Sequence, residues 1–244
     1  MSYPLGIQLY SLSREFNTDA EAALRSVPQL GFGAVETAGT YGWSLEKWQS
    51  LLAETKLVVL GAHIGIDDLE KDLAGQIAFQ KGVKNTRVII PWLAEAFRTT
   101  DGYKKAAKRI NVLAKEFHAA GIETLYHNHN FEFEKIAEGS FGLEVLMKET
   151  DPKLVKFEVD TYWVERGGLN SREFIVSHAS RIGMIHAKEL RKKDNADVPA
   201  GQGDVDFKTL LPLAKKNNWP VIVEFEGENA PAAVAASAKY LKTL

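Results

Sequence analysis

The amino-acid sequence predicts a (β/α)₈ barrel, and three observations point to this fold class. Short β-rich runs alternate with amphipathic helical stretches along the chain, which is the pattern of a parallel sheet with crossover helices. Eight such units in 244 residues give roughly 30 residues per unit, the usual size of a strand–helix repeat. The first run also lacks the glycine-rich phosphate loop of the main alternative, a doubly wound sheet.

Eight runs have the composition and length of barrel strands, which should be apolar where they are buried on both faces. In chain order the expected strands are Leu5–Tyr10, Ala34–Thr37, Val58–His63, Arg87–Pro91, Glu123–His129, Val155–Asp160, Ile182–His186 and Val221–Glu226.

The helical stretches between these runs are clearest at Asp101–Ala120 and Phe207–Asn218. Gly31 and Gly121 suit the left-handed position that ends a helix, and Asn17 or Asp19 suits a helix start.

The longest segment expected to be irregular, Leu190–Asp206, follows the seventh strand and contains Lys192 and Lys193. These lysines suit either a phosphate-binding or lid segment, or a plain exposed loop.

Composition bounds the class of protein. Apolar residues make up 45% of the chain and charged residues 25%, an ordinary globular balance. There is no composition shift or linker, so we expect a single domain over residues 1–244. The net charge of −2 provides no overall basic field for nucleic acid or an acidic membrane. Zero cysteines exclude disulfides and thiolate metal ligands and fit a reducing compartment.

The first residues, Met1 to Arg14, lack the basic and apolar regions of a signal peptide. No apolar run approaches the ~20 residues that cross a bilayer. We therefore expect a cytoplasmic protein with a small-molecule partner and no membrane or nucleic-acid partner.

Charged and imidazole side chains concentrate where the expected strands end, which is where barrel enzymes place their active sites. They are Glu36, His63, His127, His129, Glu158, Asp160, His186, Lys188, Glu224 and Glu226.

Asp160, His186 and Glu224 end three neighbouring strands, so carboxylate, imidazole and carboxylate converge if all three point into the mouth. Unpaired buried charges each cost several kcal/mol, and a divalent cation would offset that cost. Oxygen and nitrogen ligands without sulfur suit Mn²⁺, Mg²⁺, Co²⁺ or Zn²⁺. The alternative is an ion-paired ring of polar residues at the barrel rim.

At this point the sequence resembles the xylose isomerase-like TIM-barrel superfamily of sugar isomerases and epimerases, which includes the apurinic endonucleases. The resemblance covers essentially the whole chain. It rests on Leu5-Gly-Ile-Gln-Leu-Tyr10, Gly31-Phe-Gly-Ala-Val-Glu36, Gly61-Ala-His63, Glu158-Val-Asp160, His186-Ala-Lys188, Gly201-Gln-Gly-Asp-Val-Asp-Phe207 and Val223-Glu224.

The resemblance implies one divalent metal held by Glu, Asp, His and Glu at the ends of strands five to eight. Asp160, His186 and Glu224 match the last three ligands. Where relatives read Glu-Asn-His, this chain reads His127-Asn128-His129, so His127 stands in place of the glutamate. The ligand set is therefore His127, Asp160, His186 and Glu224, or one that Glu158 enters.

The resemblance also implies a reaction that removes a proton beside a carbonyl. We expect a metal-dependent isomerase or epimerase of a sugar or sugar phosphate, working through a metal-stabilised enediolate. The alternative is a lyase or dehydratase acting on a keto-sugar, keto-glycoside or keto-inositol from the same intermediate. The catalytic base is His127 or Glu158. Lys188 donates to a substrate oxygen, or else pairs with Glu158 or Glu226.

The remaining site residues are expected to bind substrate. His63 and Glu36 stand where relatives contact substrate hydroxyls, and His129 and Glu226 complete the set. Gln8, Tyr10, Trp92 and Glu132 are candidates to line the pocket, since aromatic faces pack against sugar C–H groups.

The sequence raises two further function classes. A nuclease of the apurinic-endonuclease kind needs more ligands than six histidines supply once His118 and His178 are placed in helices. A barrel that binds a sugar without turnover is the other. Relatives often form homo-oligomers, and the sequence leaves that state open.

Overall fold

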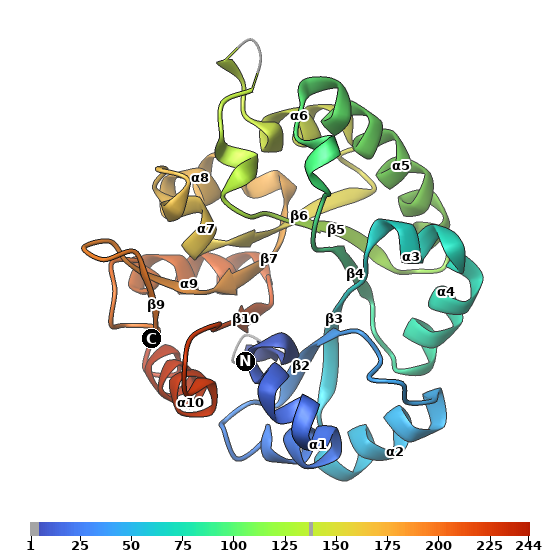
Figure 1. Cartoon of the computed structure of the whole chain (residues 1–244), viewed down its shortest axis with the longest axis vertical. Coiled ribbons are helices and arrows are strands. Elements are labelled where there is room, and N and C mark those ends of the chain that lie inside the picture. Colours follow the sequence, from blue (N-terminus) through green and yellow to red (C-terminus); the bar gives the residue numbers. More distant parts are fainter. Residues whose placement is uncertain (1–4, 137–138) are drawn as a thin grey trace.

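The computed structural model describes residues 5–136 and 139–244, and a closed barrel of eight parallel strands lies at its centre (Figure 1). The barrel strands are β1 (Leu5–Gln8), β2 (Ala34–Ala38), β3 (Val58–His63), β4 (Arg87–Ile90), β5 (Glu123–His127), β6 (Val155–Asp160), β7 (Ile182–Ala187) and β10 (Val221–Val223). Each strand pairs with the next along the chain, and β10 closes the ring against β1. The predicted (β/α)₈ fold class is confirmed.

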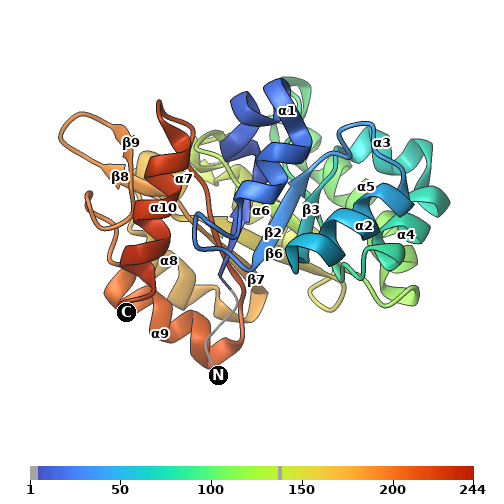
Figure 2. The ribbon, with the colours of Figure 1, turned by 90° about the horizontal axis from the view of Figure 1, so that it is seen from below.

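The helices form a ring outside these strands (Figures 1 and 2). The α-helices are α1 (Ser13–Ser26), α2 (Leu45–Thr55), α3 (Ile66–Lys71), α4 (Leu73–Gly82), α5 (Thr100–Ala119), α6 (Gly142–Glu149), α7 (Thr161–Arg166), α8 (Ser171–Ser177), α9 (Phe207–Asn217) and α10 (Ala230–Leu241). Short 3₁₀ turns are η1 (Leu9–Leu12), η2 (Glu95–Phe97), η3 (Phe131–Phe133) and η5 (Ala179–Arg181).

Side-chain alternation along the strands makes two separate apolar layers. On β10, Val221 and Val223 belong to the large core between strands and helices, whereas Ile222 belongs to a small inner cluster. That inner cluster comprises Ile89, Leu125, Met184 and Ile222, with Leu60 packed against it. These five side chains come from five different barrel strands, so they fill the barrel interior.

The inner cluster fixes the position of the polar side chains above it. A residue two positions further along a strand shares the same face. His127, His186 and Glu224 therefore follow Leu125, Met184 and Ile222 toward the C-terminal end of the barrel. The lower barrel is an apolar plug, and the polar side chains occupy the mouth.

Several helix ends follow the sequence signals. Gly31 and Gly121 have φ angles of 98° and 79°, as the left-handed position requires. Asp19 interrupts α1 with non-helical angles and accepts a hydrogen bond from the backbone N–H of Ala22 at 3.0 Å. His118 lies in α5, and His178 caps the end of α8. No helix among the described residues is long and apolar enough to cross a membrane.

Three expected strands run too far, and one expected irregular segment is partly ordered. The expected strand Leu5–Tyr10 ends at Gln8, where η1 follows, and Glu123–His129 ends at His127. The expected strand Val221–Glu226 ends at Val223, because Glu224 and Glu226 turn into the mouth instead of continuing the ladder. The expected irregular segment Leu190–Asp206 contains most of an antiparallel hairpin, β8 (Glu189–Arg191) with β9 (Ala196–Val198). Figure 2 shows this hairpin projecting at the edge of the molecule.

Candidate metal centre and active site

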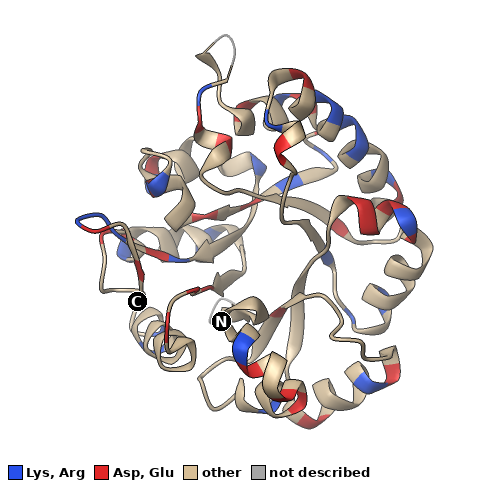
Figure 3. Cartoon of the chain, viewed as in Figure 1, with Lys and Arg blue, Asp and Glu red and all other residues tan. Residues whose placement is uncertain are grey.

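The predicted site residues gather at the barrel mouth. Glu36 lies in the middle of β2, His63 ends β3, and the others lie on or just beyond β5, β6, β7 and β10. Glu36, Glu158, Asp160 and His186 are fully buried. In Figure 3 acidic positions lie near the barrel centre, while the basic positions gather mainly on the outer helices.

A first group, the metal-ligand cluster, consists of His127, Asp160, His186 and Glu224. Each offers a donor atom, and the four atoms lie within 4.8 Å of one another. His186 Nδ1 is 3.0 Å from Glu224 Oε2 and 3.8 Å from Asp160 Oδ2. Side chains that meet this closely, from strands β5 to β10, form a cluster able to hold a metal ion.

Asp160 carries the clearest sign of a missing partner in this cluster. Its Oδ1 accepts a hydrogen bond from the backbone N–H of Trp163 at 2.9 Å, whereas its Oδ2 is buried without a partner. Burial raises the pKa of Asp160 to about 8, although Lys188 opposes the rise. A buried carboxylate oxygen without a partner is costly, and a cation among these ligands removes the cost.

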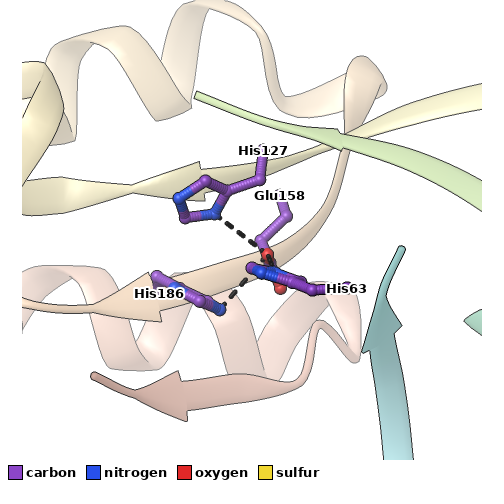
Figure 4. Close-up of side chains that lie close together, drawn as sticks. All are labelled: His63, His127, Glu158 and His186. Carbon is purple, nitrogen blue, oxygen red and sulfur yellow. Dashed lines mark hydrogen bonds and ion pairs between the residues drawn. The ribbon is translucent and has the colours of Figure 1, made fainter. Parts of the chain in front are cut away.

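A second group, the support network, lies beside the first and shares two histidines with it. Glu158 Oε2 is 2.8 Å from His63 Nε2, 3.0 Å from His127 Nδ1 and 3.2 Å from His186 Nε2. Figure 4 shows the three imidazoles around this carboxylate. His63, His127, Glu158 and His186 also meet the distance condition for a metal site. However, Glu158 Oε2 already occupies the space between the three imidazoles.

Glu36 completes the support network. Its Oε2 lies 2.6 Å from His186 Nε2 and 3.0 Å from His63 Nε2, and it accepts a hydrogen bond from Gln8 Nε2 at 2.8 Å. The Oε1 atoms of Glu36 and Glu158 are buried without partners. Thus His186 presents Nδ1 to the metal-ligand cluster and Nε2 to Glu36, the arrangement by which a carboxylate orients a ligating imidazole.

The surroundings of the four histidines at the mouth raise the pKa of two of them and lower the pKa of the other two. Burial alone would lower the pKa of His63, but the charges of Glu36 and Glu158 outweigh it and raise that pKa to about 10. The pKa of His186 is raised well above its ordinary value for the same reason. In contrast, burial keeps the pKa of His127 well below its ordinary value and lowers that of His129 to about 3. The latter two imidazoles are neutral at neutral pH.

Lys188 pairs with Glu226 through its Nζ, and Glu224 Oε2 lies 3.8 Å away. The ammonium also lies 4.9 Å from the ring centre of Trp163. Burial opposes the charged form of Lys188, but Glu224 and Asp160 outweigh it and raise the pKa of the ammonium. Of the two partners expected for a salt bridge, Glu226 is the one in contact.

The mouth encloses a cavity of about 520 Å³. Imidazoles of His127 and His129 line the wall near β5, and carboxylates of Glu224 and Glu226 line the wall near β10. Strands β6 and β7 separate these walls, so proton-accepting groups face the cavity from two sides.

Four residues proposed from sequence to line the pocket divide into two pairs. Tyr10 and Trp92 line the cavity. Gln8 and Glu132 are fully buried. Gln8 supports Glu36. Glu132 accepts hydrogen bonds from the Tyr126 hydroxyl and from the backbone N–H of His129, the latter at 2.8 Å.

Sequence reasoning missed Trp163 and Asp197. Trp163 lines the cavity, and its place three residues after Asp160 is the signal that the sequence offers for it. Asp197 lies on β9 and accepts a hydrogen bond from the backbone N–H of Glu226 at 2.9 Å. It was missed because hairpin β8–β9 was expected to be irregular.

Comparison with known proteins gives a family match. The family model described as the xylose isomerase-like TIM barrel matches residues 24–244. Among curated proteins, an inosose dehydratase of Clostridium tetani is 26% identical over 151 residues, which cover 55% of this chain and 50% of that protein. The chain thus spans about half the length of the curated relatives it matches.

Solved structures extend the likeness in fold. A sugar phosphate isomerase/epimerase from Parabacteroides distasonis superposes with a TM-score of 0.86 at 24% identity, covering 100% of this chain and 99% of that one. A protein named IOLI, described with a binding zinc atom, superposes with a TM-score of 0.74 at 14% identity, covering 98% of this chain and 96% of that one.

Proposed function

The chain belongs to the xylose isomerase-like TIM barrel family, and from this premise we propose that it is a metal-dependent isomerase or epimerase of a keto-sugar. The reaction begins by removing the proton beside the carbonyl. The observation that carries the proposal is Asp160 Oδ2, buried without a partner beside His186 and Glu224 at the mouth of the barrel.

Asp160, His186 and Glu224 would hold one divalent cation drawn from Mn²⁺, Mg²⁺, Co²⁺ and Zn²⁺. Three protein ligands with a position left for substrate are typical of catalytic sites, as opposed to closed structural ones. When bound to these residues, such a cation would supply Lewis-acid polarisation of the substrate carbonyl, which would make the neighbouring carbon-bound proton more acidic. The zinc atom of the neighbour named IOLI supports this use of the fold.

His127 is our candidate for the base. Its Nδ1 contacts Glu158 Oε2 at 3.0 Å, which leaves Nε2 for the cavity that His127 lines. Burial keeps its pKa low, so the ring is neutral and able to accept a proton. Glu158 then acts as a positioning residue that orients the imidazole, since it contacts three histidines.

Lys188 and Glu226 would act on the substrate from the wall near β10, opposite His127. The ammonium of Lys188 is held charged by Glu224 and Asp160. It is buried and paired with Glu226, so it would donate to a substrate oxygen by exchanging that contact for one with the substrate. Glu226, its partner, lines the cavity and can receive or return a proton. His127 on one wall and Glu226 on the other form an acid–base pair. Such a pair suits return of the proton either to a neighbouring carbon or to the opposite face of the same carbon.

A lyase is the second candidate, and the curated relatives favour it. The matched Clostridium proteins are named inosose dehydratases. Elimination begins with removal of the same proton, and it then expels a hydroxyl or glycosidic oxygen from the next carbon. Lys188, once released from Glu226, would protonate the departing oxygen.

Product analysis in D₂O separates the two candidates. Metal-loaded protein would be incubated with keto-sugars, keto-glycosides and keto-inositols, and the products followed by NMR and mass spectrometry. Solvent deuterium in an isomeric product supports the isomerase, and an unsaturated or dehydrated product supports the lyase. Substrates recovered without deuterium or conversion in every case contradict both.

A further inference from the structure

The outer part of the cavity contains an aromatic surface that the proposed proton transfer does not use. Trp92 and Tyr10 line the cavity and yet remain 48% and 54% exposed. They follow β4 and β1, three strands apart around the barrel. Large aromatic side chains this exposed at the rim of a cavity mark a place where a ligand surface can be covered.

Trp92 is held in place from its inner side. Its ring makes edge contacts with His129 and Phe131, each with ring centres 4.7 Å apart. The guanidinium of Arg98 lies 4.8 Å from the Trp92 ring centre and 3.6 Å from that of Phe131. An indole fixed by three neighbours and open to the cavity is a pre-organised stacking surface, which loses little entropy when a ligand covers it.

The cavity is also too large for one sugar ring alone. Its volume of about 520 Å³ falls within the roughly 300–1,000 Å³ of pockets that bury drug-sized ligands. His127 is buried at the end of β5, whereas Trp92 and Tyr10 are exposed, so a ring that reacts at His127 leaves the space beside Trp92 and Tyr10 for a second group.

The charges around the cavity disfavour a phosphorylated substrate. Among the described residues that line it, Glu224 and Glu226 are acidic and none is lysine or arginine. Lys188 is paired with Glu226, and Arg98 is stacked on aromatic rings. Arg14 does not line the cavity but an adjoining hollow of about 210 Å³, which shares Tyr10 and Glu226 with it. His63 also lines the cavity, but its Nε2 already contacts Glu36 and Glu158. The charged side chains of the lining that remain for a phosphate are therefore mainly carboxylates, which would repel it.

We propose that the substrate is an uncharged keto-glycoside, whose keto-sugar ring reacts at the metal-ligand cluster and whose second ring or aryl group stacks on Trp92. This deepens the proposed function by naming its substrate class. Tyr10 covers the second group from the other side of the mouth. Tight binding of glycosides should therefore require Trp92, whereas binding of a free hexose should not.

Calorimetric binding to the Mn²⁺-loaded protein tests the subsite without turnover. The probes are unreactive parent sugars in the gluco, galacto and manno series: the free hexose, the phenyl glycosides and disaccharides of both anomers, and the hexose 6-phosphate. The variants are Trp92→Ala and Trp92→Phe, with Val112→Ala on the outer surface of α5, where Val112 is 64% exposed, as the control.

In at least one series, the wild type should bind the phenyl glycoside or disaccharide about tenfold more tightly than the hexose, which is one decade of Kd. Trp92→Ala should lose that tenfold with hexose binding unchanged, while Trp92→Phe keeps most of it and Val112→Ala all of it. The proposal would be overturned if the wild type bound hexose and glycosides equally, bound no glycoside, or preferred the hexose phosphate. It would also be overturned if Trp92→Ala weakened binding of hexose and glycosides equally. Because the probes do not react, an absence of isomerase or lyase activity does not affect the outcome.

Discussion

Asp160 and Glu158 stand two residues apart on β6, yet their surroundings give them different roles. Glu158 Oε2 is enclosed by three imidazole nitrogens, whereas Asp160 Oδ2 faces His186 Nδ1 across 3.8 Å. The wider gap, lined by oxygen and nitrogen donors, is the place for a cation. We therefore propose that Asp160 binds the metal and that Glu158 orients the histidines.

Replacing Asp160 with Asn should lower Mn²⁺ affinity by more than tenfold, because even supporting groups around a metal are worth roughly 10–100-fold. Metal content after purification without chelator, measured by mass spectrometry, and a Mn²⁺ titration both read this effect. Asp101→Asn on the exposed start of α5 is the matched control. Equal metal content in wild type and Asp160→Asn would be incompatible with the assignment.

His127→Gln should abolish exchange of the substrate's carbon-bound proton with D₂O while retaining bound metal. Loss of a positioned base typically costs 10²–10⁴-fold in rate. NMR of recovered substrate measures the exchange, and His118→Gln in α5 is the control. If His127→Gln loses its metal instead, His127 is a ligand and another group is the base.

Glu132 predicts a pH-dependent stability. Burial raises its pKa to about 8, so the folded protein keeps this proton while the unfolded chain releases it near the ordinary value of about 4.3. Wild-type stability should therefore fall as pH rises between these values, by at most ~1.4 kcal/mol per pH unit from this group. Urea unfolding should show the advantage of wild type over Glu132→Gln shrinking from about pH 5 to about pH 8. A constant difference would rule out this titration.

At the scale of elements, the sequence predicts the first residues of the strands better than their last residues. β3 and β6 have the predicted bounds, and α5 is displaced by one residue. Apolar periodicity carries that information because it reflects burial. Strand ends at the mouth break this pattern, since polar side chains there are also buried.

The positions of two glutamates cannot be predicted from the apolar periodicity of the sequence. The strand register shifts immediately before Glu36 on β2 and immediately before Glu158 on β6. Such irregularities re-aim a side chain, and these two place both carboxylates beside the histidines. Gly61 leaves the space, because a Cβ there would lie 2.5 Å from Glu36 Oε1. The sequence indicated Glu36 and Glu158 as site residues but not their contacts with the histidines.

Hairpin β8–β9 depends on one buried carboxylate. Glu189 is 1% exposed and accepts hydrogen bonds from the backbone N–H groups of Gly201 and Val205 at 3.0 and 2.9 Å. Glu189→Ala leaves both donors unpaired, and each costs roughly 1–3 kcal/mol. We expect a loss of about 2–4 kcal/mol in the free energy of unfolding by urea, with faster hydrogen exchange over residues 189–206. Exposed Glu173→Ala is the control, and slow exchange in Glu189→Ala would contradict this role.

At the scale of the whole molecule, the apolar side chains inside the barrel and the titratable side chains lie at different levels along the barrel axis. An apolar plug of Ile89, Leu125, Met184 and Ile222 fills the lower interior, and the titratable groups occupy the mouth. Period-two alternation in the sequence predicts this division. It does not predict which buried side chains pair, because His63 meets Glu158 across 95 residues of chain and such contacts leave no local signal.

The folded protein should be stabilised by the cation it binds. A ligand at about 100 times its Kd adds about 2.7 kcal/mol, which corresponds to a rise in Tm of roughly 5–10 °C for a domain of this size. Differential scanning calorimetry of chelator-treated protein, with and without Mn²⁺, measures the shift. Asp160→Asn should show little of it, and an equal shift in that variant would place the stabilising cation elsewhere.

The central claim is that Asp160, His186 and Glu224 meet around one cation. Crystals soaked in Mn²⁺ test it directly through the anomalous scattering of the metal. The account predicts one strong peak at roughly 2.0–2.3 Å from Asp160 Oδ2, His186 Nδ1 and a Glu224 carboxylate oxygen, within the usual range for such ligands. A fully soaked crystal with no peak among these three side chains, or with its peak between His63 and Glu158, would contradict it.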